Sequence, residues 1–323
     1  MTARASSISS TSTSLPLQQI QHATRAQLLL GFAIIYVVWG STYLAIRFGL
    51  ETIPPFFMGG TRFLIAGSVM YAWARMRGAA KPTAIEWRGS AIVGFMLLFV
   101  GNGAVSWSEQ HVSSGMTSLL VATVPLWLVI CEWLQGQHPH VTKLLGVAIG
   151  LAGVGLLVLP GSKGGSVIDP IGAAVLTMSS LSWTIGSLYA RTARLAKPAT
   201  LAIGMQMLVG GAMLMVLSAA TGEIGEVAGT GISMRSGLAL LYLIVFGSLI
   251  GFSTYMWLLR VASPTAVGTY AYVNPVVAVL LGVLLAGETL PTQAVLAMLV
   301  IVGGVVLASL GPGLVRSLRA AVQ

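Results

Sequence analysis

The chain has 323 residues, of which 56% are hydrophobic and only 8% are charged, and its net charge is +9. An ordinary soluble domain carries about 25% charged residues, so this composition excludes a soluble globular protein. The basic residues flank apolar segments instead of lining one amphipathic face, which excludes nucleic acid as a partner.

The first 25 residues are rich in Ser and Thr and contain no acidic residue. We expect a disordered cytoplasmic tail over 1–25. A cleaved signal peptide is not expected, because no apolar stretch precedes Leu28. A Ser-rich segment without acids is also compatible with an organelle transit peptide, and this alternative stays open.

Ten apolar segments follow, each near the 20 residues that cross a bilayer as a helix. Backbone polar groups in lipid must bond within their own segment, so these runs are expected to be helices. We therefore predict an all-α integral membrane protein with ten transmembrane helices. The segments are 26–47, 55–75, 88–108, 112–134, 142–159, 170–190, 199–220, 237–259, 265–287 and 292–311.

The basic residues sort unevenly between the two ends of these segments. With the N-terminus in the cytoplasm, only Arg47, Lys163 and Arg235 fall outside. This bias follows the positive-inside rule and predicts that both termini, including the tail over 313–323, are cytoplasmic. The residues on the inner side are Arg4, Arg25, Arg75, Arg77, Lys81, Arg88, Lys143, Arg191, Arg194, Lys197, Arg260, Arg316 and Arg319.

The chain also repeats itself. Each half holds five predicted spans, over 26–160 and 161–312, and an odd number of spans inverts the second half across the membrane. Inverted repeats around a central cavity are typical of secondary transporters. The matched pairs are Trp39 and Trp183, Arg47 and Arg191, and Pro54 and Pro198, 144 apart, then Gly101 and Gly251, Trp107 and Trp257, Ser113 and Ser263, and Pro125 and Pro275, 150 apart.

Several local patterns resemble one family. They are Val38-Trp39-Gly40-Ser41-Thr42-Tyr43, Pro54-Pro55, Arg62-Phe63-Leu64, Thr123-Val124-Pro125, Tyr272-Val273-Asn274-Pro275, Gly287-Glu288 and Gly303-Gly304. In this order they resemble the EamA-type carriers of the drug/metabolite transporter superfamily, over roughly residues 28–311. The nearest resemblance is to bacterial amino-acid exporters, including exporters of aromatic amino acids. It implies ten helices, a central cavity and export across the inner membrane. Two positions depart from the repeat. Gln206 corresponds to Arg62, and Gln137 corresponds to Glu288, so one half lacks the charge at each of these positions.

The substrate-binding candidates combine aromatic and amide side chains. Trp39 and Trp183 lie deep in matching spans, so we expect them to contact an apolar part of the substrate. The alternative is anchoring at the membrane interface, where Trp and Tyr also gather. The alternative for Asn102 is an interhelical hydrogen bond, and the alternative for Asn274 is a bond to the carbonyl group that Pro275 frees four residues earlier. The full candidate set is Trp39, Tyr43, Asn102, Trp183, Gln206, Tyr270 and Asn274.

Arg62 is a charge about eight residues into the second span. A charge at that depth faces water, a substrate or a partner. It is a candidate for contact with a substrate carboxylate or for a gate, and the alternative is a packing anchor. Pro125 and Pro275 are candidate hinges together with Gly101 and Gly103, although static kinks are compatible with the same residues.

Catalytic and metal-binding sets are not visible, because the histidines fall in predicted loops or the tail. No cofactor or metal is expected, and no phosphate-binding loop indicates ATP-driven transport. Glu109, Glu132 and Glu288 lie near span ends and no acid occupies a span centre. This weakens proton antiport and leaves facilitated efflux or coupling through Glu288.

The expected function is a secondary transporter that exports small metabolites, foremost amino acids, by alternating access; membrane lipid and a small-molecule substrate are its expected partners. The alternatives are a drug or nucleotide-sugar transporter, an intramembrane enzyme and a membrane scaffold. A nucleotide sugar would need several cations, and only Arg62 is available within the spans. Small-residue faces at Gly146 and Gly150 and at Gly304 and Ala308 predict close packing or a homodimer contact through the fifth and tenth helices.

Overall fold

The computed structural model describes residues 23–136, 138–158, 169–262, 264–289 and 291–322, and within these ranges all regular structure is helical. Each of the ten predicted segments coincides with helix in the part that is described. Residues 1–22 of the predicted tail lie outside the described residues. Gln137 and Lys163 also lie outside them.

The first half contains seven α-helices and one π-helical segment. They are α1 (Arg25–Gly49), α2 (Pro55–Met76), α3 (Ala84–Val93), η1 (Gly94–Asn102), α4 (Gly103–Ser108), α5 (Ser114–Val121), α6 (Val124–Leu134) and α7 (Val141–Val158). The second half runs as α8 (Pro170–Thr192), α9 (Ala199–Ala220), α10 (Glu223–Thr230), α11 (Met234–Tyr242), η2 (Leu243–Phe252), α12 (Ser253–Val261), α13 (Pro264–Val267), α14 (Tyr270–Ala286) and α15 (Thr292–Val322).

Six helical stretches within the described residues are long and apolar enough to cross a membrane. They are Arg25–Gly49, Ala84–Ser108, Ser114–Leu134, Pro170–Thr192, Ala199–Ala220 and Met234–Val261. Three shorter apolar helices cover Val141–Leu156, Val273–Ala286 and Thr292–Ala308. The chain is therefore built as a helical membrane protein, while the number of ten spans stays a prediction.

The stretch Ser114–Leu134 is broken between α5 and α6. Pro125 lies in the first turn of α6, where its missing N–H leaves no bond unmade. The sequence predicts Pro125 inside a span, and the structure adds that the helix starts anew there. Pro275, by contrast, lies inside α14.

Side chains of α8 donate hydrogen bonds to backbone carbonyl groups of these irregular segments. Ser180 and Thr184 donate to the Leu120 and Val124 carbonyl oxygens beside the break, both at 3.3 Å. Ser179 donates to the Gly101 carbonyl oxygen of η1 at 2.8 Å. Broken or widened helices are tolerated in membranes where neighbouring side chains satisfy the backbone in this way.

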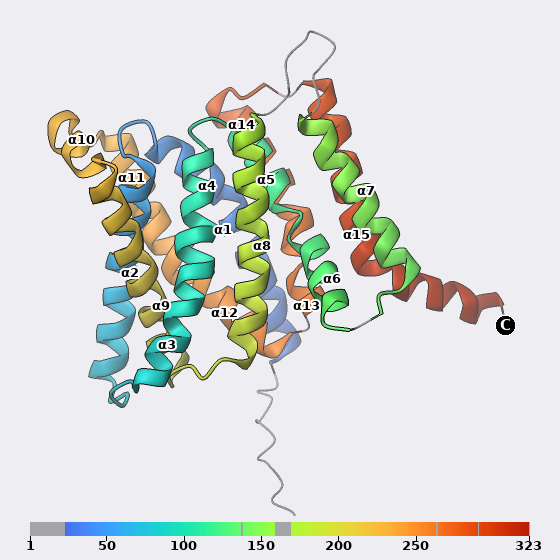
Figure 1. Ribbon diagram of the computed structural model, residues 1–323, viewed down its shortest axis with the longest axis horizontal. Coiled ribbons are helices and arrows are strands. Elements are labelled where there is room, and N and C mark those ends of the chain that lie inside the picture. Colours follow the sequence, from blue (N-terminus) through green and yellow to red (C-terminus); the bar gives the residue numbers. More distant parts are fainter. Residues whose placement is uncertain (1–22, 137, 159–168, 263, 290, 323) are drawn as a thin grey trace, which may run out of the picture.

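Glycines let two pairs of helices pack closely. On α2 and α9, a Cβ added to Gly67 would lie 3.0 Å from the Gly204 carbonyl oxygen. On α7 and α15, a Cβ at Gly304 would collide with the Gly150 backbone. The small-residue faces predicted for packing or dimerisation therefore pair with each other inside the chain. Figure 1 shows α7 and α15 side by side at one edge of the bundle.

Helices α1 and α8 lie at the centre of the bundle. Helix α1 packs against α14, α11 and η2, and α8 packs against η1, α4, α5 and α6 (Figure 1). A π-helical segment thus lies beside each central helix. Such segments often mark functional sites, and here they widen the helices that surround the central cavity.

Candidate functional site

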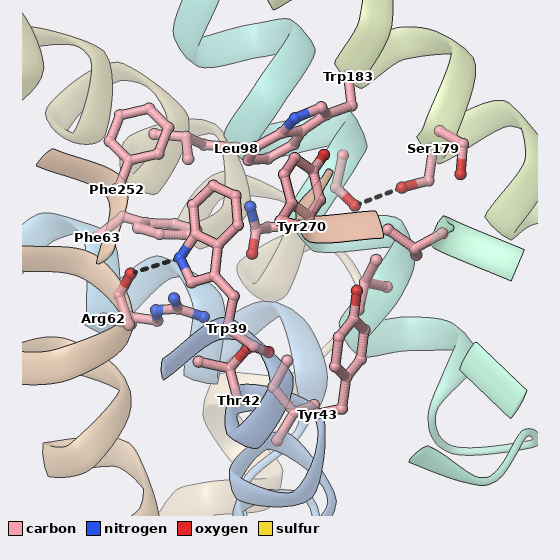
Figure 2. A pocket seen from close by; sticks show the side chains of 17 residues that line it. Trp39, Thr42, Tyr43, Arg62, Phe63, Leu98, Ser179, Trp183, Phe252 and Tyr270 are labelled. Carbon is pink, nitrogen blue, oxygen red and sulfur yellow. Dashed lines mark hydrogen bonds between the residues drawn. The ribbon is translucent and has the colours of Figure 1, made fainter. Parts of the chain in front are cut away.

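A cavity of about 640 Å³, part of it open to the surroundings, lies at the centre of the bundle (Figure 2). Helices from both halves of the chain surround it, and its lining is mostly apolar and aromatic. The lining residues are Trp39, Thr42, Tyr43, Ile46, Arg62, Phe63, Leu98, Gly101, Asn102, Val105, Val121, Ser179, Ser180, Trp183, Gly247, Phe252 and Tyr270.

The two matched tryptophans meet in this cavity. The rings of Trp39 and Trp183 are 5.5 Å apart and perpendicular, an edge-to-face arrangement that aromatic pairs favour. Each ring lies on a glycine of the opposite half. A Cβ at Gly101 would approach the Trp183 ring to 3.0 Å, and one at Gly251 would approach the Trp39 Nε1 to 2.6 Å. The repeated Trp and Gly positions therefore serve one shared packing arrangement.

Tyr255 joins these rings through a closed chain of hydrogen bonds. The Trp183 Nε1–H donates to the Tyr255 hydroxyl at 3.0 Å. The Ser187 hydroxyl donates to the Trp183 carbonyl oxygen at 2.7 Å, so the Tyr255 hydroxyl donates its own proton to Ser187 Oγ, also at 2.7 Å. The bonds fix the orientation of the Trp183 ring.

The aromatic cluster of Trp39, Trp183, Tyr255 and Tyr270 separates two cavities. Their ring centroids lie between 4.8 and 6.0 Å from one another in the contacting pairs. A second cavity of about 410 Å³ lies on the other side, lined by Tyr255 and Tyr270 together with residues such as Pro125 and Arg191. Tyr270 belongs to the lining of both cavities, so the cluster lies where they adjoin.

Arg62 is the charged residue among the described residues that line the central cavity. Its side chain is only 6% exposed. Its Nε–H donates to the neutral Ser248 hydroxyl at 2.7 Å, and its guanidinium carbon lies 4.8 Å from the centre of the Phe63 ring. No described carboxylate lies within ion-pair distance of it. The described site therefore leaves the charge of Arg62 without a counter-ion, an arrangement that is costly unless water or a ligand compensates it.

Asn102 also lines the cavity. Its geometry is compatible with both predicted roles, contact with a substrate and a hydrogen bond within the bundle. Its amide nitrogen donates to the Leu97 carbonyl oxygen of η1 at 3.2 Å. Among the described residues, no hydrogen bond to its amide oxygen is found, so this oxygen can accept from a ligand.

Two predicted substrate contacts lie away from the described cavity lining. Gln206 is fully buried on α9, and neither of its amide atoms has a described partner. The Asn274 amide nitrogen, assigned from the acceptors around it, donates to the Tyr36 and Tyr270 carbonyl oxygens at 3.2 Å each. Asn274 therefore joins α14 to α1.

The remaining predicted positions divide as follows. Trp39, Tyr43, Trp183, Tyr270, Arg62 and Gly101 line the central cavity, and Pro125 lines the second one. Gly103 packs against Leu214, and Pro275 is buried in α14 outside both described linings. Nothing is described for the side chain of Tyr272.

Sequence reasoning missed Tyr255 and the serines of α8. Tyr255 has no aromatic counterpart in the first half, so the comparison of the two halves did not identify it as a site residue. The signal was helical spacing, because Ser248, Gly251 and Tyr255 recur at intervals of three and four on one face. No group of three or more metal-ligating side chains occurs among the described residues.

The comparison with protein families gives a double match. The model of the EamA-like transporter family matches residues 27–159 and again residues 170–310. The inner membrane transporter YedA of Escherichia coli K12 is 43% identical over 280 residues, which cover 86% of this chain and 89% of YedA.

More distant relatives span most of the chain as well. The transporter YvbV of Bacillus subtilis 168 is 23% identical over 285 residues, which cover 88% of this chain and 91% of YvbV. A chloroplastic WAT1-related protein of Arabidopsis thaliana is 25% identical over 260 residues, covering 79% of this chain and 62% of that protein. A solved crystal structure with 21% identity superposes with a TM-score of 0.61, covering 89% of this chain and 98% of the other, and it shares the fold.

Proposed function

The chain belongs to the EamA-like transporter family, and from this premise we propose that it is a secondary transporter that exports small amphipathic metabolites, foremost amino acids, across the bacterial inner membrane. The descriptions of YedA and YvbV name transporters without a substrate, so the substrate class is argued from the cavity.

The observation that carries the substrate class is the pairing of one buried cation with a wall of aromatic rings. Arg62 supplies the charge and Trp39, Trp183 and Tyr270 supply the apolar face. An amino acid with an apolar side chain has a carboxylate to meet Arg62 and a body to contact the rings. Asn102 can accept from its ammonium group.

The proposed architecture is ten spans in two inverted five-helix halves, 26–160 and 161–312, with both termini cytoplasmic. Contacts between the two halves support this architecture, because each central tryptophan packs on a glycine of the other half. The two family matches and the π-helical segments at equivalent places support it as well. A homodimer would use outer surfaces of α7 and α15, since their glycine faces pack on each other.

Alternating access fits two cavities divided by aromatic rings. In the proposed cycle the cluster around Tyr255 parts on one side while the opposite end closes. Gly101 lies in η1 and Pro125 at the break between α5 and α6, so both occupy irregular backbone beside the cavities. They are the proposed hinges, with Gly103 and Pro275 in the adjoining helices.

The test uses purified protein in liposomes and three related solutes. Preloaded L-phenylalanine has both a carboxylate and an ammonium group, 3-phenylpropanoate has only the carboxylate, and phenethylamine has only the ammonium. We expect protein-dependent release of phenylalanine, and no release of phenethylamine. The absence of release above empty liposomes across a broad amino-acid panel would exclude the amino-acid class.

A nucleotide sugar is a weaker candidate for this cavity. Its diphosphate would require several cations, and Arg62 is the basic residue among the described lining residues. A lipophilic drug fits the aromatic wall but leaves Arg62 without an anion. The release of a neutral lipophilic dye in the same liposomes, with no release of any carboxylate, would favour that alternative.

A further inference from the structure

Two glutamates from opposite halves of the chain lie near one another at one end of the bundle. Glu288 follows α14, and its carboxylate accepts from the Ser114 N–H at 2.9 Å, the Ser114 hydroxyl at 2.8 Å and the Gly115 N–H at 3.2 Å. These donors lie in the first turn of α5. The Glu288 carboxyl group is therefore fully hydrogen-bonded and ties the end of α14 to α5.

Glu109 is the opposite case. It is the residue directly after α4, its side chain is 0% exposed, and neither carboxyl oxygen has a hydrogen-bond partner among the described residues. Glu223, another buried acid, instead accepts from the Phe56 and Phe57 N–H groups. A buried carboxylate without donors is strongly disfavoured, so this environment favours the protonated form of Glu109.

The groups that face Glu109 act in opposite directions. Burial raises the pKa of Glu109 well above its ordinary value, the charge of Glu288 raises it further, and Arg47 of α1 lowers it. Tyr43 of α1 also lies within electrostatic reach. Arg47 does not bond the carboxyl group; its Nη1 donates to the Glu109 backbone carbonyl oxygen at 3.2 Å. Arg47 is itself exposed.

We propose that Glu109 is a proton-binding site that controls the opening of this end of the bundle, and this rests on the proposed transport function. The site lies where cavity-lining elements meet: α1 carries Trp39 and Tyr43, and α4 continues η1 with Gly101 and Asn102. The protonated side chain is compatible with the closed packing. When this end opens, water reaches Glu109, the O–H bond breaks, the proton passes to water, and the new carboxylate pairs with Arg47.

The sign of the pH dependence follows from this order of events. Low pH holds Glu109 neutral and keeps the end closed, so transport slows. High pH removes the proton and favours opening. For a single proton, flux rises by at most about tenfold per pH unit through the titration range. The proposal therefore requires that the pH dependence of flux comes from the titration of Glu109 and not from that of the exposed acids.

The first experiment needs no transported solute. Dicyclohexylcarbodiimide reacts with protonated carboxyl groups in apolar surroundings, and mass spectrometry of the labelled full-length protein identifies the residue. We expect labelling of Glu109 that declines as the pH rises, and none at Glu288, whose carboxyl oxygens are held by donors of Ser114 and Gly115. Labelling of Glu288 in place of Glu109 would overturn the proposal.

The second experiment measures phenylalanine release from liposomes with equal pH on both sides. Glu109→Gln replaces the protonated group by an amide of similar shape, so we expect a folded protein with slow, pH-independent release. Glu132→Gln is the control, because Glu132 pairs with Lys143 at 3.2 Å and is partly exposed. Wild-type release without pH dependence, or an unchanged pH profile in Glu109→Gln, contradicts the proton site and leaves the transport function intact. Absence of release in the wild type contradicts the transport function itself.

Discussion

At the scale of single residues, Arg62 is the residue that we propose selects solutes with a carboxylate. It is a buried guanidinium whose described side-chain hydrogen bond is to a neutral hydroxyl, so its positive charge is not compensated within the described site. The sequence predicts its depth, and the structure places it buried in the cavity lining; its contact with a substrate carboxylate stays a prediction. Its bond to Ser248 was not predictable, since the two residues are 186 positions apart.

The substitution Arg62→Gln tests the role of this charge. Gln206 occupies the matching position of the second half, so a glutamine is compatible with this place in the helix. Loss of a charged hydrogen bond of about 1.5–3 kcal/mol should raise the KM for phenylalanine about 10- to 100-fold. Liposome flux at graded substrate concentrations measures this change. The exposed Arg77, which stacks on Trp73, gives the control Arg77→Gln; equal KM values in both variants would contradict the role of Arg62.

Tyr255 is the residue whose hydroxyl orients Trp183. Tyr255→Phe removes the acceptor of the Trp183 N–H and the donor to Ser187. An unsatisfied buried donor costs about 1–3 kcal/mol, so we expect a shifted tryptophan fluorescence spectrum and slower phenylalanine release. Tyr71→Phe, whose ring packs against Trp87 outside the described cavity linings, should leave both unchanged. Identical spectra for wild type and Tyr255→Phe would show that the hydroxyl does not hold the ring.

At the scale of helices, irregular backbone is concentrated around the cavity. The π-helical segments η1 and η2 lie at equivalent places in the two halves, and α5 and α6 are separated by a break. The prolines and glycines of the sequence predict weak points in these spans. The π-helical geometry itself was not predictable from these residues, and neither were the bonds that serines of α8 donate to the η1 carbonyl oxygens from another part of the chain.

The close contact of α7 and α15 can be tested with two adjacent glycines. A Cβ at Gly304 would meet the Gly150 backbone, whereas one at Gly303 would meet nothing within 4 Å. Gly304→Val should therefore destabilise the protein by about 1–3 kcal/mol or more, and Gly303→Val should not. Thermal unfolding of the detergent-purified variants measures the difference. Equal losses in both would mean that helix propensity, not the contact, sets the effect.

At the scale of the whole molecule, the sequence predicts much of the architecture and little of the site. Apolar segment length predicts where most helices lie, because lipid leaves the backbone no other choice. The last helix differs, since α15 continues to Val322, past the predicted end at residue 311. The short helix α10 and the partners of Gln206 and Glu109 depend on packing between distant segments. Sequence spacing does not indicate such contacts. The sequence therefore predicts only that Glu109 lies near a span end, whereas the structure shows it fully buried.

The inversion of the two halves can be tested by labelling. Ala80 and Ala228 lie in the connections that follow the second helix of each half, and both are exposed. Cys131, the single native cysteine, is first replaced by alanine. A cysteine is then introduced at position 80 in one variant and at position 228 in another. A membrane-impermeant maleimide added to intact cells should label Ala228→Cys and spare Ala80→Cys. Labelling of both from the same side would contradict the inverted arrangement.

The central claim is that solutes cross the membrane through the cavity around Trp39. The most direct measurement is the release of preloaded L-phenylalanine from liposomes that contain wild type, Trp39→Ala or Trp73→Ala. Trp39 contacts three aromatic rings, and at about 0.5–1.5 kcal/mol per ring contact its loss should slow release at least about tenfold. Trp73 is 51% exposed, and its loss should leave the rate unchanged. Equal release by wild type and Trp39→Ala, or wild-type release no faster than from empty liposomes, would contradict the account.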